Sequence, residues 1–209
     1  MFGATLRIKQ DGKEVVLRQP NLDELKYLVI ASRDFQVRQY LNNINVPTLK
    51  SEEIWYESLS ENKEEIAWGI EYNGTLAGIT SIGCLTNQFG CGTSGIMIFG
   101  PRGEGVGSLA HIGRTWYASE VLNLRTVVSH VWSPNEASKK ALLRVGYIIT
   151  GSERRVRYFN GNWIDKLLFT WTNPRYANEM YSGEIPEDTQ KGIELAQRTL
   201  DLAKEVVTY

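Results

Sequence analysis

A glycine-rich segment in the middle of the chain has the residue types and spacing of an anion-binding turn. It reads Gly100-Pro-Arg102-Gly-Glu-Gly105-Val-Gly107 and follows an apolar run rich in isoleucine. Glycines let the backbone approach a ligand closely and let successive amides point at it. A helix that starts there adds a partial positive charge. The segment therefore predicts a pyrophosphate-binding turn between a strand and a helix.

The segment does not match a P-loop and matches the dinucleotide-binding pattern only in part. A P-loop requires G-x-x-x-x-G-K-[ST], and no such run occurs. The run Gly105-Val-Gly107-Ser-Leu-Ala110 does fit the dinucleotide fingerprint G-x-G-x-x-A. That fold places an acidic residue roughly 20 residues further on, whereas the next apolar run ends Ser129-His130-Val131. Nicotinamide binding and a purely structural turn remain as alternatives, and the missing acid disfavours the first.

The residues around the segment predict the elements that must position it. Hydrophobic periodicity and β-branched content indicate a strand over 94–99, a helix over 106–121, a strand over 124–131 and a short helix from Pro134-Asn135 to Arg144. The order strand, loop, helix, strand, helix is that of an α/β unit.

Hairpins and further helices are predicted on either side of this unit. Alternating apolar residues flank the turns Asp11-Gly12, Asn73-Gly74 and Asn160-Gly161, which predicts hairpins over 6–18, 66–82 and 146–171. A helix should begin after Asn21 as its N-cap, with Glu24 in the capping-box position. Another should begin at Ser51. The amphipathic helix over 187–207 should cover its own domain or a second subunit.

Composition excludes several classes of partner. The chain has 209 residues, with 23 Lys plus Arg, 24 Asp plus Glu and a net charge of −1, so we expect no nucleic-acid partner. Arg154, Arg155 and Arg157 form the one basic cluster, which we interpret as a solvated strand face.

The sequence predicts neither a metal site nor a membrane segment. Cys84 and Cys91 are interpreted as reduced thiols, and with the two histidines they are too few for a zinc site. Since there is neither a signal-peptide pattern nor an apolar run of about 18 residues, we expect a cytoplasmic protein with no membrane partner.

Two motifs in this order resemble the GNAT superfamily of N-acetyltransferases. Arg102, Gly105 and Gly107 match R-x-x-G-x-G, and Asn135, Ser138 and Gly146-Tyr147 match the family's N-x-x-S…G-F/Y segment. The hairpin around Asn160-Gly161 resembles that of the ribosomal-protein N-terminal acetyltransferase-like branch. The resemblance spans residues 14 to 174. It implies an acetyl-coenzyme A-dependent domain over 1–174 and a C-terminal extension with an amphipathic helix over 175–209.

The resemblance implies an α/β (α+β) fold with a mixed, mostly antiparallel twisted sheet flanked by helices. Its central strands, here 94–99 and 124–131, should splay apart to admit the pantetheine arm. A bulge in the first should free an amide near Met97 or Ile98 for the thioester carbonyl. The implied coenzyme-binding residues are Met97, Ile98, Phe99, Arg102, Gly103, Glu104, Gly105, Val106, Gly107, Ser108, Asn135, Ser138 and Lys140.

Proton transfer requires a base, because the attacking amine must be neutral. His130 is the first candidate, since its strand should end beside the thioester and its reference pKa is about 6.5. A purely structural histidine is the alternative. Glu71 and Tyr72 are further candidates. Many relatives protonate the leaving thiolate with a tyrosine seven residues after the asparagine, but this chain has Leu142 there. The resemblance suggests that Ser138 donates a hydrogen bond to the sulfur instead, and the alternative is an early-helix residue that bonds to the backbone.

The expected function is acetyl transfer from acetyl-coenzyme A, without a metal, to a primary amine. The amine belongs to a protein N-terminus, a small molecule or a sugar, and the sequence does not separate these. Leu142 keeps open a second hypothesis, a non-catalytic acyl-coenzyme A sensor or scaffold. The acceptor side should comprise the early helices, the loop 83–92 and the last hairpin, with Trp55, Tyr56, Tyr158 and Trp163 as candidate lining residues or core residues. A homodimer is possible.

Overall fold

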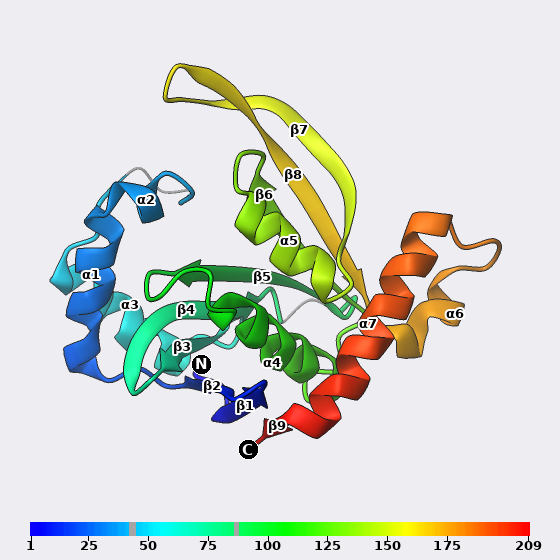
Figure 1. Cartoon of the computed structure of the whole chain (residues 1–209), viewed down its shortest axis with the longest axis horizontal. Coiled ribbons are helices and arrows are strands. Elements are labelled where there is room, and N and C mark those ends of the chain that lie inside the picture. The colour runs from blue at the N-terminus through cyan, green and yellow to red at the C-terminus, as the bar shows by residue number, and fades with distance from the viewer. Residues whose placement is uncertain (42–44, 86–87) are drawn as a thin grey trace.

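The computed structural model describes residues 1–41, 45–85 and 88–209. One mixed sheet runs through it in the order β7-β8-β6-β5-β4-β3-β2-β1-β9 (Figure 1). Neighbouring strands are antiparallel except β5 and β6, which are parallel. The predicted mixed, mostly antiparallel sheet with flanking helices is confirmed.

The strands and helices follow the sequence pattern closely. The strands are β1 (Leu6–Gln10), β2 (Lys13–Arg18), β3 (Ile66–Tyr72), β4 (Thr75–Gly83), β5 (Cys91–Ile98), β6 (Thr126–Trp132), β7 (Ile148–Phe159), β8 (Asn162–Thr172) and β9 (Val207–Thr208). The α-helices are α1 (Leu25–Arg33), α2 (Phe35–Arg38), α3 (Leu49–Glu61), α4 (Val106–Glu120), α5 (Glu136–Arg144), α6 (Ala177–Met180) and α7 (Glu187–Val206). Short 3-10 turns cover Leu22–Glu24 and Pro174–Tyr176.

Local chemistry explains the turns and helix starts. In the three predicted hairpin turns both residues have positive φ, for example Asn73 at 51° and Gly74 at 74°, which matches the twist of a two-residue hairpin. Asn21 and Glu24 form the predicted capping box. The predicted start of α3 at Ser51 is wrong. Thr48 is the N-cap, and Ser51 lies in the first turn, where its hydroxyl and the Thr48 side chain bond each other's backbone amides.

Helices cover the two faces of the sheet unequally. The main core forms between the sheet and α4, α5 and α7, with Trp68, Phe169 and Trp171 fully buried in it. A smaller cluster on the opposite face contains Leu25 and Leu28 of α1 and Leu76 of β4. Trp55 and Tyr56 of α3 pack against it.

The C-terminal helix packs on its own domain. It contacts α4 and β1, and a Cβ atom added at Gly146 would come within 2.5 Å of the Ala196 amide nitrogen on α7. The chain then continues into β9, which pairs antiparallel with β1 and completes that edge of the sheet. Tyr209 stacks on Trp116 of α4, with ring centroids 5.8 Å apart. Within the described residues, the first of the two predicted roles for this helix is therefore the one observed.

No helix in the described part of the chain is long and apolar enough to cross a membrane.

Candidate active site

The central feature of the site is the point where β5 and β6 separate (Figure 1). The two strands pair only from Cys91↔Thr126 to Thr93↔Val128. Beyond that point β5 continues along β4, and β6 continues along β8. The Ser129 hydroxyl donates to the Ser94 carbonyl at 3.1 Å, exactly where the strands part. The predicted splayed strands are present.

Backbone alternation decides which groups of β5 face the gap. The Ser94 carbonyl points towards β6. The Phe99 amide points the other way, because it donates to the carbonyl of Ala77 in β4. Since backbone groups alternate in direction along a strand, the amides of Ile96 and Ile98 face the gap and that of Met97 faces β4. Of the two amides predicted to face the thioester, that of Ile98 faces the gap and that of Met97 does not. Ile96 was not predicted, because nothing in the residue types marks the side to which an amide points.

The bulge expected in β5 lies at its end. Pairing with β4 is regular from Thr93 to Ile98. The amides of Phe99 and Gly100 then both donate to the Ala77 carbonyl, at 2.9 and 2.8 Å. Two residues opposite one is the pattern of a classic β-bulge. It turns the chain away from β4 and into the glycine loop.

The glycine loop leads directly into α4. Gly103 and Gly105 have φ angles of 81° and 87°, a left-handed conformation that glycine adopts without strain. Gly105 is the N-cap of α4, and as a glycine it has no side chain that could cap this end of the helix. The amides of the first turn have no acceptor within the helix. No described protein atom lies within 4 Å of a Cβ atom built on either glycine. The loop therefore offers open amides at a positive helix end, as an anion-binding turn requires.

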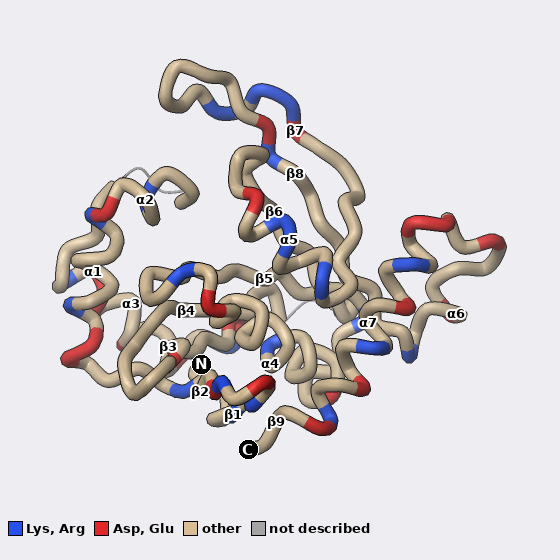
Figure 2. The backbone as a smooth tube through the Cα atoms, viewed as in Figure 1, with Lys and Arg blue, Asp and Glu red and all other residues tan. Residues whose placement is uncertain are grey.

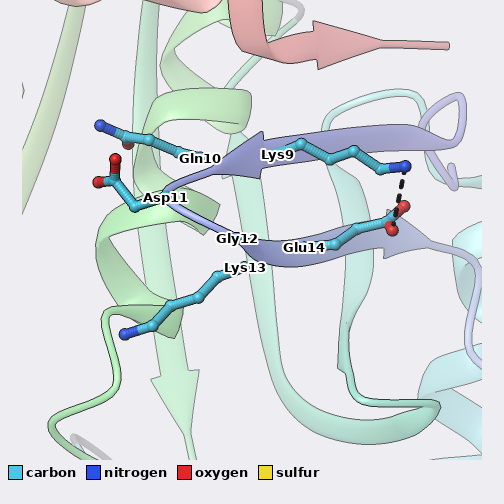
Figure 3. A pocket seen from close by; sticks show the side chains of 6 residues that line it. All are labelled: Lys9, Gln10, Asp11, Gly12, Lys13 and Glu14. Atoms are coloured by element: carbon cyan, nitrogen blue, oxygen red, sulfur yellow. Dashed lines mark ion pairs between the residues drawn. The ribbon is translucent and has the colours of Figure 1, made fainter.

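Two side chains from other elements hold this loop. The Lys13 ammonium, at the tip of the β1–β2 hairpin, donates to the Glu104 carbonyl at 2.7 Å. The Glu104 carboxylate accepts a hydrogen bond from Tyr72 and thereby raises the pKa of that phenol. Figure 3 shows Lys13 extending away from the hairpin while Lys9 pairs with Glu14 on its far side. These long-range contacts were not predictable from sequence, because the residues are 91 positions apart in the case of Lys13.

Removing the Lys13 contact should weaken coenzyme binding without unfolding the protein. Lys13→Ala loses one charge-assisted hydrogen bond to the loop, so we expect acetyl-coenzyme A affinity to fall by roughly three- to ten-fold, about 1 kcal/mol. Titration calorimetry measures it. Lys9→Ala removes an equal charge from the same hairpin and should change affinity little. Equal losses in both variants would show that only overall charge matters.

Asn135 and Ser138 lie at the start of α5, beside the gap. The Asn135 side chain accepts from the Ser138 amide at 3.2 Å and so serves as the helix N-cap. Ser138 is half-buried, whereas Lys140 and Arg102 are exposed. Leu142, at the position where many relatives carry tyrosine, is 1% exposed in the main core.

His130 lies on the strand segment of β6 that has left β5. Thr93 and Val128 share a face, so the period of two places Gly95 and Met97 on that face together with His130 and Trp132. Burial lowers the pKa of His130, the Lys166 charge lowers it further, and the Glu153 charge opposes both. The lowered pKa favours the neutral form of His130 near pH 7, which is the form that a general base requires.

Glu71 is held in an ion-pair cluster. The Arg18 guanidinium contacts Glu71 at 2.5 Å and Glu24 at 2.7 Å, which joins β2, β3 and the start of α1. Hydrogen bonds with Glu24, the stronger influence, and with Glu71 raise the pKa of Arg18. Arg18 in turn lowers the pKa of Glu24. Glu71 is therefore part of a structural ion-pair cluster, and its catalytic role stays a prediction.

A buried cation lies beneath β5 where the strands part. Arg114 of α4 is 1% exposed and donates to the Thr80 hydroxyl, the Gly95 carbonyl and Nδ1 of His111. Because the guanidinium can only donate, Nδ1 must be an acceptor and His111 must be neutral. Burial and the Arg114 charge hold the pKa of His111 well below its usual value.

This arrangement makes the fold sensitive to acid. As pH falls below about 6.5, the unfolded chain protonates His111 while the native state does not, so stability falls with pH. We expect a loss approaching 1.4 kcal/mol per pH unit between about pH 6 and 5, measured by urea unfolding. His111→Asn keeps an acceptor for Arg114 and should flatten this slope, whereas His130→Gln should largely retain it. An unchanged slope in His111→Asn would contradict the assignment.

Comparisons with known proteins place the geometry in a family. The model of the acetyltransferase (GNAT) domain matches residues 14–148, more than half of the chain. The chain belongs to the GNAT acetyltransferase family. The expected N-acetyltransferase class and its cosubstrate, acetyl-coenzyme A, are thereby confirmed. No curated protein matches the chain significantly.

Solved GNAT structures share the fold at low sequence identity. Spermidine N-acetyltransferase from Vibrio cholerae, in complex with CoA and spermine, has a TM-score of 0.70 and 17% identity, covering 78% of this chain and 98% of its own. Mycobacterium smegmatis RimJ, in complex with CoA-disulfide, has a TM-score of 0.69 and 17% identity, covering 91% of this chain and 92% of its own. RimL, a ribosomal L7/L12 alpha-N-protein acetyltransferase in complex with coenzyme A, has a TM-score of 0.67 and 18% identity, covering 79% of this chain and 97% of its own.

Proposed function

We propose that this GNAT protein transfers an acetyl group from acetyl-coenzyme A to a primary amine by direct attack in a ternary complex. One observation carries the proposal: the gap between β5 and β6 leads to a glycine loop whose amides are open. The amides of β5 that no longer pair with β6 suit an extended pantetheine arm, and the loop suits its diphosphate.

The coenzyme would bind along β5 and the loop. The diphosphate would lie on the amides from Gly103 to Ser108, with Arg102 and Lys140 as candidate contacts to the phosphates of the coenzyme. The amides of Ile96 and Ile98 would pair with the pantetheine arm and polarise the thioester carbonyl. Asn135 and Ser138 would border the arm from α5.

The reaction would need two proton movements. The amine nitrogen attacks the thioester carbon, His130 takes one of its protons, and the C–S bond breaks as the tetrahedral adduct collapses. The departing thiolate accepts a hydrogen bond from the Ser138 hydroxyl, because Leu142 has no polar group, and takes its proton from solvent or from the protonated His130. Ser138→Ala should lower kcat roughly ten-fold and leave coenzyme affinity nearly unchanged. A fall in affinity alone would remove Ser138 from this role.

A non-catalytic acyl-coenzyme A sensor is the alternative, and the buried Leu142 is the observation that favours it. An acceptor screen with detection of the released coenzyme A thiol separates the two. We expect thiol release with at least one class of amine. Micromolar binding of acetyl-coenzyme A without release for any N-terminal peptide, amino sugar or polyamine would support the sensor.

The remaining expectations stay predictions. They are a cytoplasmic location, a homodimer, no nucleic-acid or membrane partner, and the division at residue 174. The acceptor loop 83–92 is described except for residues 86–87, which lie outside the described residues.

A further inference from the structure

The bent end of the β7–β8 hairpin meets α2 above the face that carries His130. Between Glu153 and Arg157 the pairing register of β7 shifts, and the hairpin arches (Figure 1). Phe159 stacks on Phe35 with ring centroids 5.7 Å apart. Arg157 donates to the Leu41 carbonyl at 3.0 Å. We refer to this contact between the two segments as the hairpin–α2 junction.

N–H donors gather around this junction without enough acceptors. The Arg157 guanidinium lies over the rings of Trp132 and Phe159, at 5.1 and 4.8 Å from their centroids. The indole nitrogen of Trp132 and one guanidinium nitrogen of Arg38, in α2, are buried and have no acceptor among the described residues. Buried donors without a partner are costly, and proteins keep them where ordered water, an ion or a ligand supplies the acceptor.

The charges near the junction are also mainly positive. Figure 2 shows Lys and Arg concentrated on the bent part of β7–β8. The carboxylates from the elements nearest to it already have partners. Asp34 accepts from the Gln36 amide, Asp165 from the Arg155 amide, and Glu153 from Lys166.

The position of the junction relates these donors to the acceptor. Trp132 follows His130 by two residues on the same face of β6, a separation of roughly 7 Å at about 3.3 Å per residue. An amine held at His130 would therefore direct the group a few bonds from its nitrogen towards Trp132 and Arg157.

We propose that the hairpin–α2 junction binds a carboxylate of the acceptor. This inference rests on the proposed function and narrows it: the acceptor is an amine with negative charge a few bonds from its nitrogen, and polyamines are poor acceptors. The carboxylate belongs either to an acidic residue near a peptide N-terminus or to a small amino acid-like molecule.

The test compares acceptors that differ in one group. Short peptides with Glu, Gln or Lys in the second position, free glutamate and glutamine, and spermidine are assayed at saturating acetyl-coenzyme A. We expect kcat/KM for each Glu-containing acceptor to exceed that of its Gln counterpart at least ten-fold, and spermidine to be poorest. The peptide pair and the amino-acid pair distinguish the two sources of the carboxylate.

Variants assign the preference to the junction. Arg157→Met and Trp132→Phe, which removes the indole N–H and keeps an aromatic ring, should each reduce the Glu-over-Gln preference to about three-fold or less. Arg154→Met removes a charge from an exposed position on the same strand and should preserve the preference. Arg157→Lys serves if the Met variant does not fold, and it should retain part of the preference.

Failure of this inference differs from failure of the proposed function. Turnover with equal rates for Glu, Gln and Lys peptides, or fastest with spermidine, would overturn the inference and leave acetyl transfer standing. Absence of turnover with every amine would count against acetyl transfer. Calorimetry of the same peptides with the coenzyme A complex then decides the inference, and equal affinities would overturn it.

Discussion

Gly105→Val should abolish measurable coenzyme binding while the protein stays folded. Gly105 has a φ of 87°, a conformation that costs a residue with a Cβ atom about 1–2 kcal/mol, and valine would also project into the space over the first-turn amides of α4. That space is open in the protein, with no described atom within 4 Å of the added Cβ, so the loss would come from the ligand side. Calorimetry should show acetyl-coenzyme A affinity reduced at least ~100-fold, about 2.7 kcal/mol.

Gly161→Val is the matched control for this change. Gly161 has a φ of 78° and equally open surroundings, but it lies in the turn between β7 and β8, which β6 separates from β5 in the sheet. Its backbone strain is comparable, so its melting temperature should fall by a similar amount while coenzyme affinity is kept. If both variants bind coenzyme as the unaltered chain does, the loop is a structural turn and not a diphosphate site.

Replacing His130 should slow acetyl transfer and remove the acid limb of its pH profile. With its pKa lowered by burial and by Lys166, His130 stays neutral down to pH values below about 6.5, and activity should fall as pH drops through the lowered pKa. His130→Gln should reduce kcat/KM by roughly ten-fold or more at pH 7.5. Coenzyme affinity should be unaffected, since the side chain lies on the acceptor face.

The two charges near His130 should move its titration in opposite directions. Lys166→Met removes a positive charge and should raise the pKa, shifting the acid limb to higher pH. Glu153→Gln should lower the pKa and shift the limb to lower pH. The chain has two histidines, so NMR can follow His130 directly, with His111 as the buried reference. Titration shifts without any matching change in the rate profile would make His130 a bystander.

The elements that the sequence predicted well are those fixed by local chemistry. Asn73-Gly74 and Asn160-Gly161 specify tight turns through their own backbone preferences, and the Asn21–Glu24 box specifies a helix start. The glycine loop was also recognisable, because its residue types and its place after an isoleucine-rich strand occur together. Such features depend on neighbours within a few residues.

The elements that the sequence did not predict depend on distant partners. β9 is a two-residue strand that exists only because β1 offers an open edge. Helix α2 has four residues, too few to show a periodic pattern. Arg114 gave no signal either, since a charged residue in an amphipathic helix usually faces solvent, and here its acceptors come from β4, β5 and α4.

The residues of the candidate site also fall into those that could be predicted from the sequence and those that could not. The glycine loop could be proposed from residue type and spacing, whereas Asn135, Ser138 and the placement of His130 beside the thioester came from the resemblance to the GNAT family. The amides of Ile96, the Lys13 contact and the hairpin–α2 junction required the register of the sheet and the bend of β7, which arise from pairing between residues far apart in sequence.

A crystal structure of the protein with acetyl-coenzyme A tests the central claim most directly. The account predicts diphosphate oxygens at hydrogen-bond distance, about 2.7–3.2 Å, from backbone nitrogens between Gly103 and Ser108, with the thioester in the gap between β5 and β6. A coenzyme bound with its diphosphate elsewhere, and the loop amides facing solvent, would contradict it.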